Sequence, residues 1–363
     1  MRRKIGNDRT DCKELNGYKP CRNHKKTKQP CAECGHYRPV GIRILIIKVR
    51  AAGEVIRNTP ILHRLRDSYP DAEITWLTSF PDLIPTQFVD RVLSYDWETA
   101  IQLTEERFDL LLSLDKESGL AALANKVKAT VKKGFILSDT GKTLPADDDA
   151  HEKWLTGIDD AIMLANKKHY VQEVFEICGF EWQNEEYILP QWPKKKLINT
   201  EGPVVGINTG AGQMWRTRIP RAEKVEEIIE ALLAQAKDIV LLGGPDEDAR
   251  NSNWKKKYGV HYLGVMPFLE FINVINHCDA VITPVTLALH IAIGLSKQVV
   301  LLNNIFNKHE FHLFGRGVII EPDLDCLGCY KKDFDDQCPV EDCTQLYDVR
   351  KIISFLEAHP QKG

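Results

Sequence analysis

The stretch that decides the fold is GIRILIIKVRAAGEVIRNTP, residues 41–60. Its first half, RILIIKV, is a continuous apolar run, which is typical of a parallel strand buried on both faces of a sheet. Its second half starts with small residues and leads into ILHRLRDSYP, which has apolar residues at helical spacing. A strand, a small-residue turn and a helix can present backbone N–H groups to a phosphate. The turn also carries a carboxylate, Glu54, which is either a catalytic group or a charge at a helix N-terminus.

The same alternation continues along the chain on both sides of a linker. Strand patterns such as DAEITWLTS and FDLLLSLD alternate with helix patterns such as GLAALANKVKA, and a proline- and lysine-rich segment, residues 186–203, then precedes a second alternating set that begins with PVVGINTG. This order predicts two Rossmann-like, doubly wound α/β domains, residues 41–190 and 191–363. Ligands of open α/β sheets bind beyond the carboxyl ends of the strands, so we expect the two domains to face a cleft that holds the site.

Composition narrows the class of protein. The chain has 363 residues, 43% of them hydrophobic and 27% charged, which is typical of a soluble globular protein with more than one domain. Its formal net charge of −3 excludes a polycation. No apolar run approaches the roughly 20 residues that a membrane span needs, and the start MRRKIGNDRTDCKELNG lacks the apolar segment of a secretory signal. We therefore expect a cytoplasmic protein.

A glycine-bearing turn follows the first strand pattern of the second domain. In VVGINTGAGQMWRTRIP, the turn holds Thr209, Gly210 and Gly212, and glycines let backbone N–H groups approach an oxyanion closely. Arg216 and Arg218 follow, and either can neutralise a diphosphate. A loop with turn glycines and a solvated arginine pair explains the same residues about as well.

Two further turns in the second domain have candidate ligand-binding residues. In VLLGGPDEDAR, Glu247 follows a strand end, where a carboxylate can accept hydrogen bonds from ribose hydroxyls or simply favour a helix N-terminus. In VITPVTLALHIAIGLS, Thr286 can cap a helix that carries His290 four residues later. Such a helix N-terminus suits a diphosphate, while a packed histidine is the plainer explanation. Three such turns in one half of the chain are more informative than any one alone.

Together these residues resemble glycosyltransferase family 9, the heptosyltransferase family. The matching motifs are AAGEVIRNTP, G-x-N-T-G-A-G with a following W-x-T-R, LLGGPDE and TLALHIAIGL, in that order from about residue 41 onward. The resemblance implies a GT-B fold with the donor site in the C-terminal domain. It also implies an enzyme that transfers a heptose from ADP-heptose with inversion, without a catalytic metal at the sugar diphosphate.

The resemblance carries over to named positions, with two departures. Gly53, Glu54 and Val55 stand where the family has a G-D-V turn whose aspartate is the base; glutamate keeps the carboxylate and adds one methylene, about 1.5 Å of reach. Val285 stands where the family usually has an aspartate, which removes one polar contact to the donor. The resemblance places Thr209, Gly210 and Arg218 at the donor phosphates, Glu247 at the ribose, and Thr286, Leu287 and His290 over the diphosphate; Gly53 and Arg216 complete the candidate donor site.

Eight of the ten cysteines fall into two clusters, which in a reducing compartment indicate metal before disulfide. The pairs Cys31-x2-Cys34 and Cys326-x2-Cys329 have chelate spacing, and Cys21-x2-His24 is an alternative second pair in the N-terminal cluster. We predict structural zinc or iron at one or both clusters, with unliganded thiols as the alternative. The C-terminal finger, residues 326–343, is similar to the iron-holding cysteine finger of autotransporter heptosyltransferases. The predicted ligands are Cys12, Cys21, Cys31 and Cys34 in an N-terminal arm, and Cys326, Cys329, Cys338 and Cys343 in the finger.

The N-terminal arm, residues 1–40, is basic, with eleven lysine and arginine residues against four acidic ones. That charge suits contact with an anionic lipid surface at the membrane periphery, or with nucleic acid. Few aromatic residues accompany the basic ones, which argues against nucleic acid. We therefore expect the basic arm to contact an anionic membrane surface at the membrane periphery.

Three functions remain on the sequence alone. The leading one is an inverting glycosyltransferase that moves a heptose or related sugar from ADP-heptose, or another nucleotide-diphospho-sugar, to a lipopolysaccharide-type or other cell-surface glycan. The second has a protein acceptor, as in autotransporter O-heptosyltransferases. The third is a non-catalytic, metal-stapled GT-B scaffold, which the changes at Glu54 and Val285 support. A homo-oligomer is compatible with each. The candidate acceptor contacts are Asp109, Asp115, Lys116 and the segment DDDAHEKW, residues 147–154.

Overall fold

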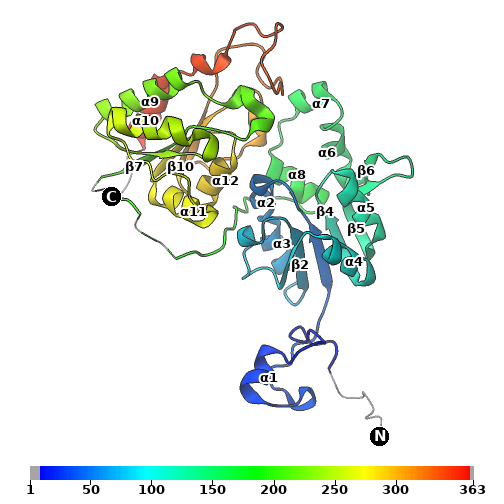
Figure 1. The fold of residues 1–363 in the computed structure, drawn as a ribbon. Coiled ribbons are helices and arrows are strands. Elements are labelled where there is room, and N and C mark those ends of the chain that lie inside the picture. The colour runs from blue at the N-terminus through cyan, green and yellow to red at the C-terminus, as the bar shows by residue number, and fades with distance from the viewer. Residues whose placement is uncertain (1–8, 194, 196, 201, 360–363) are drawn as a thin grey trace. The chain divides into compact units, whose positions relative to one another are not determined.

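The computed structural model describes residues 9–193, 195, 197–200 and 202–359, so the first eight residues of the predicted arm lie outside the described residues. The chain forms two compact units. One consists of Met1–Arg50 and Ile61–Ala150, and the other of Ala51–Pro60 and His151–Gly363 (Figure 1). The domain ranges expected from the sequence stay a prediction.

The first unit is built on a six-stranded sheet in the order β3-β2-β1-β4-β5-β6. β1 to β5 pair in parallel and β6 pairs antiparallel with β5. The central strand β1 has Ile44 to Ile47 fully buried, as its apolar run predicts. The strands are β1 (Arg43–Ile47), β2 (Glu73–Thr78), β3 (Arg91–Ser94), β4 (Arg107–Ser113), β5 (Lys128–Leu137) and β6 (Thr143–Pro145).

Short helices connect these strands. Asp96 starts α4 by accepting a hydrogen bond from the Thr99 backbone N–H at 2.8 Å, which satisfies one of the free N–H groups of the first turn. Leu103 of α4 and Leu120 of α5 pack with Leu45 of β1 in one apolar cluster. The helices are α3 (Ile61–Ser68), α4 (Trp97–Glu105) and α5 (Ser118–Lys126), with the 3-10 turns η2 (Pro81–Leu83) and η3 (Asp148–Ala150).

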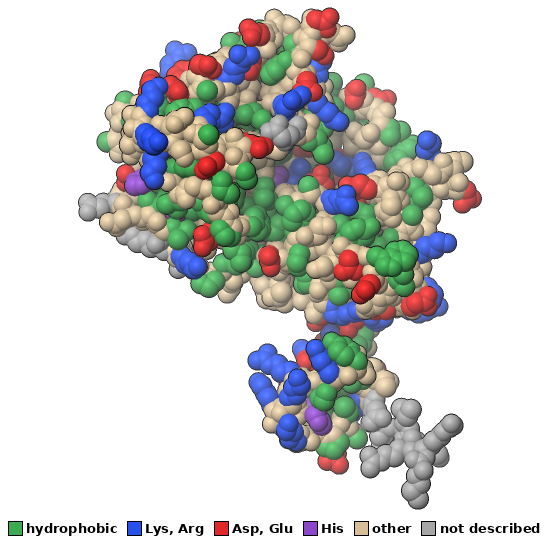
Figure 2. Space-filling view, in the orientation of Figure 1, with side chains coloured by type: hydrophobic (Ala, Val, Ile, Leu, Met, Phe, Trp, Pro, Cys, Tyr) green, Lys and Arg blue, Asp and Glu red, His purple; other side chains and the backbone are tan. Residues whose placement is uncertain are grey.

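The described part of the N-terminal arm, residues 9–40, holds two short helical segments, α1 (Arg22–Thr27) and η1 (Cys31–Glu33). Lys13 attaches it to the first unit, because its Nζ donates to the carbonyl oxygens of Asp71 (2.7 Å) and Ala72 (3.1 Å). Figure 2 shows lysine and arginine side chains gathered along one side of the arm. Its exposed basic residues include Lys19, Arg22, Lys25, Lys26 and Lys28.

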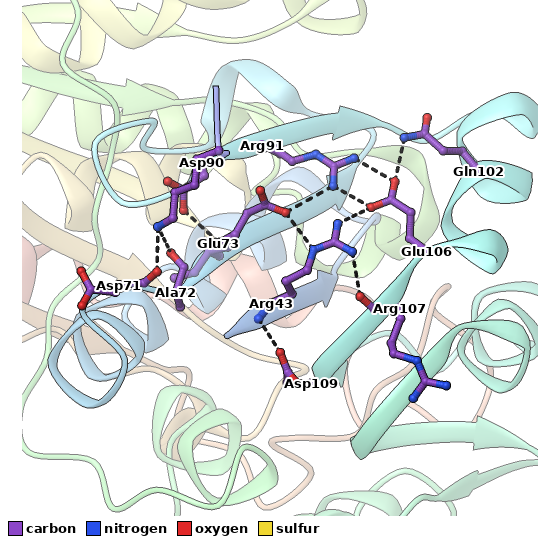
Figure 3. Close-up of polar contacts among 12 residues, drawn as sticks. Arg43, Asp71, Ala72, Glu73, Asp90, Arg91, Gln102, Glu106, Arg107 and Asp109 are labelled. Atoms are coloured by element: carbon purple, nitrogen blue, oxygen red, sulfur yellow. Dashed lines mark hydrogen bonds and ion pairs between the residues drawn. The ribbon is translucent and has the colours of Figure 1, made fainter. Parts of the chain in front are cut away.

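The amino ends of the strands in the first unit are joined by ion pairs (Figure 3). Arg91 donates from Nη1 and Nη2 to the two carboxylate oxygens of Glu106 at 2.7 and 2.9 Å. Arg43 donates from Nη2 to Glu106 at 2.5 Å and from Nε to Glu73 at 3.1 Å. Asp109 accepts from the Arg43 backbone N–H at 2.8 Å at this same end. Because ligands of such sheets bind at the opposite, carboxyl ends of the strands, this position does not favour the predicted role of Asp109 as an acceptor contact.

Glu106 gives the first unit a pH-dependent stability. Burial alone raises the pKa of Glu106, but hydrogen bonds from Arg91 and Arg43 outweigh it and lower the pKa to about 2. A carboxyl group with a lowered folded-state pKa stabilises the fold above its unfolded pKa, and this stabilisation is lost as the pH falls toward the folded pKa. We expect Glu106→Gln to lower the free energy of unfolding by roughly 2 kcal/mol at neutral pH, and by progressively less below about pH 4.5.

Chemical denaturation at a series of pH values measures this effect. The matched control is Glu105→Gln, since the Glu105 side chain is 77% exposed and its ion pair with Lys128 contributes little. Parallel pH profiles for the wild-type and Glu106→Gln chains would contradict the assignment.

Two charged residues at the carboxyl ends of β1 and β4 form a buried ion pair. Lys48 Nζ lies 2.5 Å from Asp115 Oδ1, and the two side chains are 2% and 1% exposed. The other oxygen of Asp115 accepts from the Val49 backbone N–H at 2.5 Å. Burial raises the pKa of Asp115, and the Lys48 charge opposes that rise. Asp115, a predicted acceptor contact, is therefore engaged inside the first unit, while Lys116 lies with its Nζ 5.1 Å from the centre of the Phe135 ring.

The second unit contains a five-stranded, fully parallel sheet in the order β11-β10-β9-β7-β8. Helices α9 and α13 pack against this sheet through Ile228, Leu232, Ile352 and Leu356, which belong to one apolar cluster with the strands. The strands are β7 (Val204–Asn208), β8 (Asp238–Leu242), β9 (Ala280–Pro284), β10 (Gln298–Leu302) and β11 (Gly317–Ile320).

Helix α12 is apolar all round and accordingly buried from Ala288 to Ile293, with α2 and α11 packed on it. Within the described part of the chain, no helix combines the length and apolar character that crossing a membrane requires. The helices of this unit are α2 (Ala52–Asn58), α6 (His151–Leu155), α7 (Asp160–Ala165), α8 (Tyr170–Ile177), α9 (Ala222–Ala234), α10 (Asp248–Tyr258), α11 (Phe268–His277), α12 (Leu287–Gly294) and α13 (Val349–Ala358). Its 3-10 turns are η4 (Gln213–Arg218), η5 (Pro245–Glu247), η6 (Lys308–Glu310) and η7 (Cys343–Leu346).

Candidate functional site

A pocket of about 910 Å³ opens within the second unit. Its wall contains the last residue of β7, Asn208, together with the segments that follow β8 and β9, so it lies at the carboxyl ends of the parallel strands, where open α/β sheets bind ligands. Helix α2 contributes its first turn. Of the residues predicted from the sequence, the pocket is lined by Gly53, Glu54, Gly210, Arg218, Glu247, Thr286, Leu287 and His290.

Glu54 lies in the first turn of α2, where its carboxylate also matches the positive end of the helix. Its backbone carbonyl accepts from Asn58 Nδ2 at 2.7 Å, one turn later. Gly53 is required beside it, since a Cβ at this position would come within 2.6 Å of His290 Cδ2. The close approach of α2 to α12 thus places a carboxylate and an imidazole on neighbouring parts of one pocket wall.

Asn208 ties the turn after β7 to the start of α12. Its Nδ2 lies 3.1 Å from the Gly210 carbonyl oxygen and 2.9 Å from Thr286 Oγ1. Thr286 occupies the N-cap position of α12, but its side chain makes no capping hydrogen bond, contrary to the sequence prediction. The physical reason is that the hydroxyl is engaged with Asn208 and Thr283. The helix start is therefore held by side chains that the sequence patterns did not single out.

Thr209 points away from the pocket, although the family resemblance places it at the donor phosphates. Its side chain is fully buried, and its Oγ1 lies within hydrogen-bond distance of two acceptors, Asn251 Oδ1 at 2.8 Å and the Leu242 carbonyl oxygen at 3.2 Å. The neighbouring Gly210 does line the pocket, and a Cβ there would lie 2.0 Å from Glu247 Oε1. The glycine at this position therefore leaves room for the Glu247 carboxylate.

Glu247 is 8% exposed, and its Oε2 accepts from the Gly244 backbone N–H at 2.8 Å. This hydrogen bond fixes the carboxylate against the turn after β8. The adjacent Arg250 donates from Nη2 to the Thr209 carbonyl oxygen at 2.6 Å. Burial lowers the pKa of Arg250, and the Glu247 charge opposes the shift. The carboxylate is therefore oriented and lies next to a cation, as a hydrogen-bond acceptor for hydroxyl groups should be.

Of the two arginines predicted to bind phosphate, only one lies in the pocket. Arg218 lines the pocket, donates from Nη1 to the Val285 carbonyl oxygen, and its Nε has no partner among the described residues. Burial lowers the pKa of Arg218 to about 10, so it remains a cation at neutral pH. Arg216 instead lies outside the pocket with 63% of its side chain exposed, and its Nη2 is paired with Asp333 at 2.6 Å. Residues two apart on a helical turn do not share a face, and the pairing with Asp333 holds Arg216 on its own side of η4.

His290 is a neutral group at the base of this pocket. It is 5% exposed and its Nδ1 has no hydrogen-bond partner among the described residues. Burial lowers the pKa of His290 well below its usual value, and the charges of Arg57 and Arg218 lower it further. The imidazole therefore stays unprotonated at neutral pH and can donate or accept one hydrogen bond. Val285, which stands in the place of the family's aspartate, is buried and contributes its backbone carbonyl to Arg218.

Three further polar residues of the pocket wall were not found from the sequence: Arg57, Glu310 and Tyr330. Arg57 could have been identified from the sequence, because it stands three residues after Glu54 and so lies on the same face of α2. Glu310 and Tyr330 come from the segments after β10 and β11. No local pattern indicates that those two segments reach the same pocket.

The four-cysteine finger contributes Tyr330 to the pocket wall, but its thiols do not form a metal site among the described residues. Burial raises the pKa of Cys343 to about 11, with smaller contributions from Cys329 and Cys326, so these thiols lie within range of one another's charge. Asn304 Nδ2 donates to Cys343 Sγ at 3.2 Å. Across the residues that the structure describes, however, no group of three His, Cys, Asp or Glu side chains is placed to hold a metal ion, at either cluster.

The cysteines of the N-terminal arm take part in local structure. Cys21 caps α1, since its Sγ accepts from the His24 backbone N–H at 3.4 Å. Cys12 forms an antiparallel bridge with Pro39, which closes the arm. Cys31 and Cys34 span the η1 turn, where the Cys34 N–H donates to the Cys31 carbonyl oxygen at 3.3 Å. The predicted metal ligands of the arm are therefore present on short turns, and a bound ion stays a prediction.

Comparison with known proteins gives the relatives of this chain. The family model of glycosyltransferase family 9 (heptosyltransferase) matches residues 97–320, which is more than half of the chain. No curated protein matches the sequence.

Solved structures share the fold at low sequence identity. A glycosyl transferase family 9 structure from Veillonella parvula DSM 2008 is 15% identical with a TM-score of 0.66, over 88% of this chain and 97% of that one. The E. coli ADP-heptose lps heptosyltransferase II is 14% identical with a TM-score of 0.61, over 87% and 98%. TibC, an iron-containing dodecameric glycosyltransferase from enterotoxigenic E. coli H10407, is 13% identical with a TM-score of 0.55, over 88% and 76%. At these identities the likeness shows the fold alone, and it confirms the predicted α/β class.

Proposed function

The chain belongs to glycosyltransferase family 9, the heptosyltransferase family, and is a glycosyltransferase; from that premise we propose that it moves a heptose from ADP-heptose to an acceptor hydroxyl with inversion. The observation that carries the proposal is the pocket in the second unit, where Glu54, Arg218, Glu247 and His290 line one cavity at the carboxyl ends of parallel strands. The names of the solved relatives support the donor, since one is an ADP-heptose lps heptosyltransferase.

Glu54 acts as the general base in this reaction. The acceptor hydroxyl passes its proton to the Glu54 carboxylate while its oxygen attacks the anomeric carbon of the heptose. The bond from that carbon to the diphosphate oxygen breaks, its electron pair leaves with the diphosphate, and ADP is released. Because the attack comes from the face opposite the leaving group, the anomeric configuration inverts.

Positive charge at the diphosphate comes from the protein. Arg218 is a half-buried cation that lines the pocket, and the described ion pairs include none between Arg218 and a carboxylate. The start of α12 directs its positive end toward the same pocket, where Thr286 and Leu287 lie. A charge fixed in a buried pocket stabilises the leaving diphosphate more strongly than the same charge in water. Glu247, held by Gly244, accepts hydrogen bonds from the ribose hydroxyls.

We propose a lipopolysaccharide-type glycolipid or another surface glycan as the acceptor. A protein hydroxyl is the second candidate, and the four-cysteine finger favours it, because this finger is similar to that of autotransporter heptosyltransferases. A cytoplasmic location, with the basic arm on an anionic membrane surface, would bring the enzyme to a lipid-linked acceptor. The exposed lysines around α1 support that contact. A homo-oligomer is a further part of the proposal, since TibC is dodecameric.

We also propose one structural zinc or iron ion in the finger, and a second in the arm. Cys326-x2-Cys329 has chelate spacing, and the Asn304 amide supports Cys343 from outside, as is usual for a ligating thiolate. Such an ion would fix the finger and supply no chemistry to the transfer. Elemental analysis of the purified chain should find about two ions per chain if both clusters are filled. A metal-free chain that is fully folded would contradict this part of the proposal.

A transfer assay tests the function as a whole. The purified chain is incubated with ADP-heptose and either a lipopolysaccharide core glycolipid or a serine-containing peptide, and mass spectrometry follows the addition of one heptosyl residue. The expected result is ADP release with heptosyl transfer to one acceptor class, and the anomeric configuration of the product, read by NMR, should be inverted. Transfer with retention would rule out the single displacement. Binding of donor without release of ADP in the presence of every acceptor would favour the non-catalytic scaffold.

A further inference from the structure

Arg57 is a buried cation in the pocket wall that the proposed mechanism does not yet use. It lies on α2, three residues after Glu54, lines the pocket, and is 6% exposed. Burial alone lowers the pKa of Arg57, but Tyr187, Glu310, Tyr170 and Glu54 together raise it above its usual value. The side chain is therefore charged even without a bound ligand. Burying this charge costs free energy, which an interaction with an anionic group offsets.

The guanidinium is held in one orientation by the surrounding residues. Its Nη2 donates to the Glu310 carbonyl oxygen at 3.1 Å and lies 3.8 Å from Glu310 Oε2. Its flat face stacks on the Tyr170 ring, with 3.8 Å between the guanidinium carbon and the ring centre. Tyr330 fixes Glu310 in turn, by donating from its hydroxyl to Oε1. A side chain held from two sides in this way loses little freedom when it binds a ligand.

Arg57 nevertheless keeps donor capacity for a ligand. Its Nε is buried and has no hydrogen-bond partner among the described residues, although an arginine has five N–H donors in a planar fork that suits phosphate. Arg218, which also lines the pocket, likewise has a buried Nε with no hydrogen-bond partner among the described residues. Both charges act on His290 and lower its pKa, so both cations lie within electrostatic range of the same imidazole. Burial raises the pKa of Glu310, which weakens the ion pair between its carboxylate and Arg57.

The position of Arg216 leaves a place for a second cation. The sequence predicts that Arg216 and Arg218 together neutralise a diphosphate, but Arg216 pairs with Asp333 outside the pocket. A diphosphate with two negative groups would then meet Arg218 alone among the residues predicted from the sequence. Arg57 supplies the missing charge from a different element, α2.

We propose that Arg57 is a donor-binding residue that contacts the phosphate on the sugar side of the diphosphate, with Arg218 as its partner. Its place on α2 selects that phosphate: Glu54 must reach an acceptor oxygen next to the anomeric carbon, and Arg57 follows Glu54 by less than one turn. The sugar-side phosphate is the group bonded to that carbon. Glu310 and Tyr330 orient Arg57 and do not contact the diphosphate. The inference rests on the proposed function, because it assumes a nucleotide-diphospho-sugar in this pocket.

Calorimetric titration with ADP and AMP tests the proposal, since AMP lacks the sugar-side phosphate. We expect Arg57→Gln to weaken ADP binding about tenfold to a hundredfold, the usual effect of losing a charged hydrogen bond, and to change AMP binding less than threefold. Arg57→Lys keeps the charge without the planar fork, and it should weaken ADP binding by a smaller factor. Arg350→Gln is the matched control, because it removes the same charge from a side chain that is 91% exposed.

The outcomes separate the inference from the proposed function. If ADP and AMP weaken by the same factor in Arg57→Gln, or if neither changes, Arg57 is a packing residue and the inference is wrong. If the wild-type chain binds none of ADP, UDP and GDP, the proposed function itself fails. Circular dichroism on each variant shows whether it is folded, and if Arg57→Gln does not fold, the comparison of ADP with AMP on Arg57→Lys decides in the same way.

Discussion

Glu54→Gln is expected to lower turnover by about a hundredfold to ten-thousandfold, the range that loss of a general base produces, while ADP affinity stays within about twofold. The amide has the shape of the acid but cannot take a proton from the acceptor hydroxyl. Glu54 lies in the first turn of α2, whose packing on α12 depends on Gly53, so the substitution leaves the pocket wall in place. Steady-state kinetics of transfer measures the loss, and calorimetry measures the affinity.

A second variant at the same position tests the reach of the base. Glu54→Asp restores the residue that the family usually has in its G-D-V turn and shortens the side chain by one methylene. If the pocket is adapted to glutamate, this variant should keep a proton acceptor and lose turnover by less than Glu54→Gln does. Turnover of Glu54→Gln equal to that of the wild-type chain would show that Glu54 is a helix-terminal charge and that another group is the base.

Asp115→Asn is expected to destabilise the first unit by about 3–5 kcal/mol, because it leaves the Lys48 charge buried without its counter-charge. Both side chains are almost fully enclosed, so water cannot replace the lost partner. The amide also weakens the hydrogen bond from the Val49 N–H at the end of β1. Chemical denaturation followed by far-UV circular dichroism measures the change in the free energy of unfolding.

The double variant Lys48→Met, Asp115→Leu serves as the control for charge. It removes both members of the pair and replaces them with apolar side chains, so it should recover most of the stability that Asp115→Asn loses. If the double variant is as unstable as the single one, the site depends on the hydrogen bonds of Asp115 and not on the ion pair. A single variant as stable as the wild-type chain would contradict the burial of the pair.

Local patterns predicted the strands and helices of this chain because each pattern is set by residues close in the sequence. The first five residues of RILIIKV form the central strand β1 with its apolar residues buried, and DIVLL and AVITP form β8 and β9 in the same way. GLAALANKVKA forms α5 as far as Lys126, with Leu120, Ala121, Leu123 and Ala124 buried. Gly210 and Glu247 were predicted from neighbouring turns, and the structure brings them together in the pocket.

Distant contacts could not be predicted in that way. The two arginines of the turn after β7 point to different places because Asp333, more than a hundred residues later, binds Arg216. Arg57, Glu310 and Tyr330 meet from three distant segments, so no spacing in the sequence links them. The family resemblance places Thr209 at the donor phosphates, but its hydroxyl is buried against Asn251 of α10. In each case a tertiary partner decides where the side chain points.

Titration of the wild-type chain with ADP, UDP and GDP by calorimetry tests the central claim most directly, namely that the pocket of the second unit binds a nucleoside diphosphate. The proposal predicts saturable binding of ADP, with weaker binding of UDP and GDP and a large loss of affinity in Arg218→Gln, since Arg218 is a half-buried cation of the pocket wall. If none of the three nucleotides binds, or if ADP binds equally well to Arg218→Gln, the pocket is not the donor site.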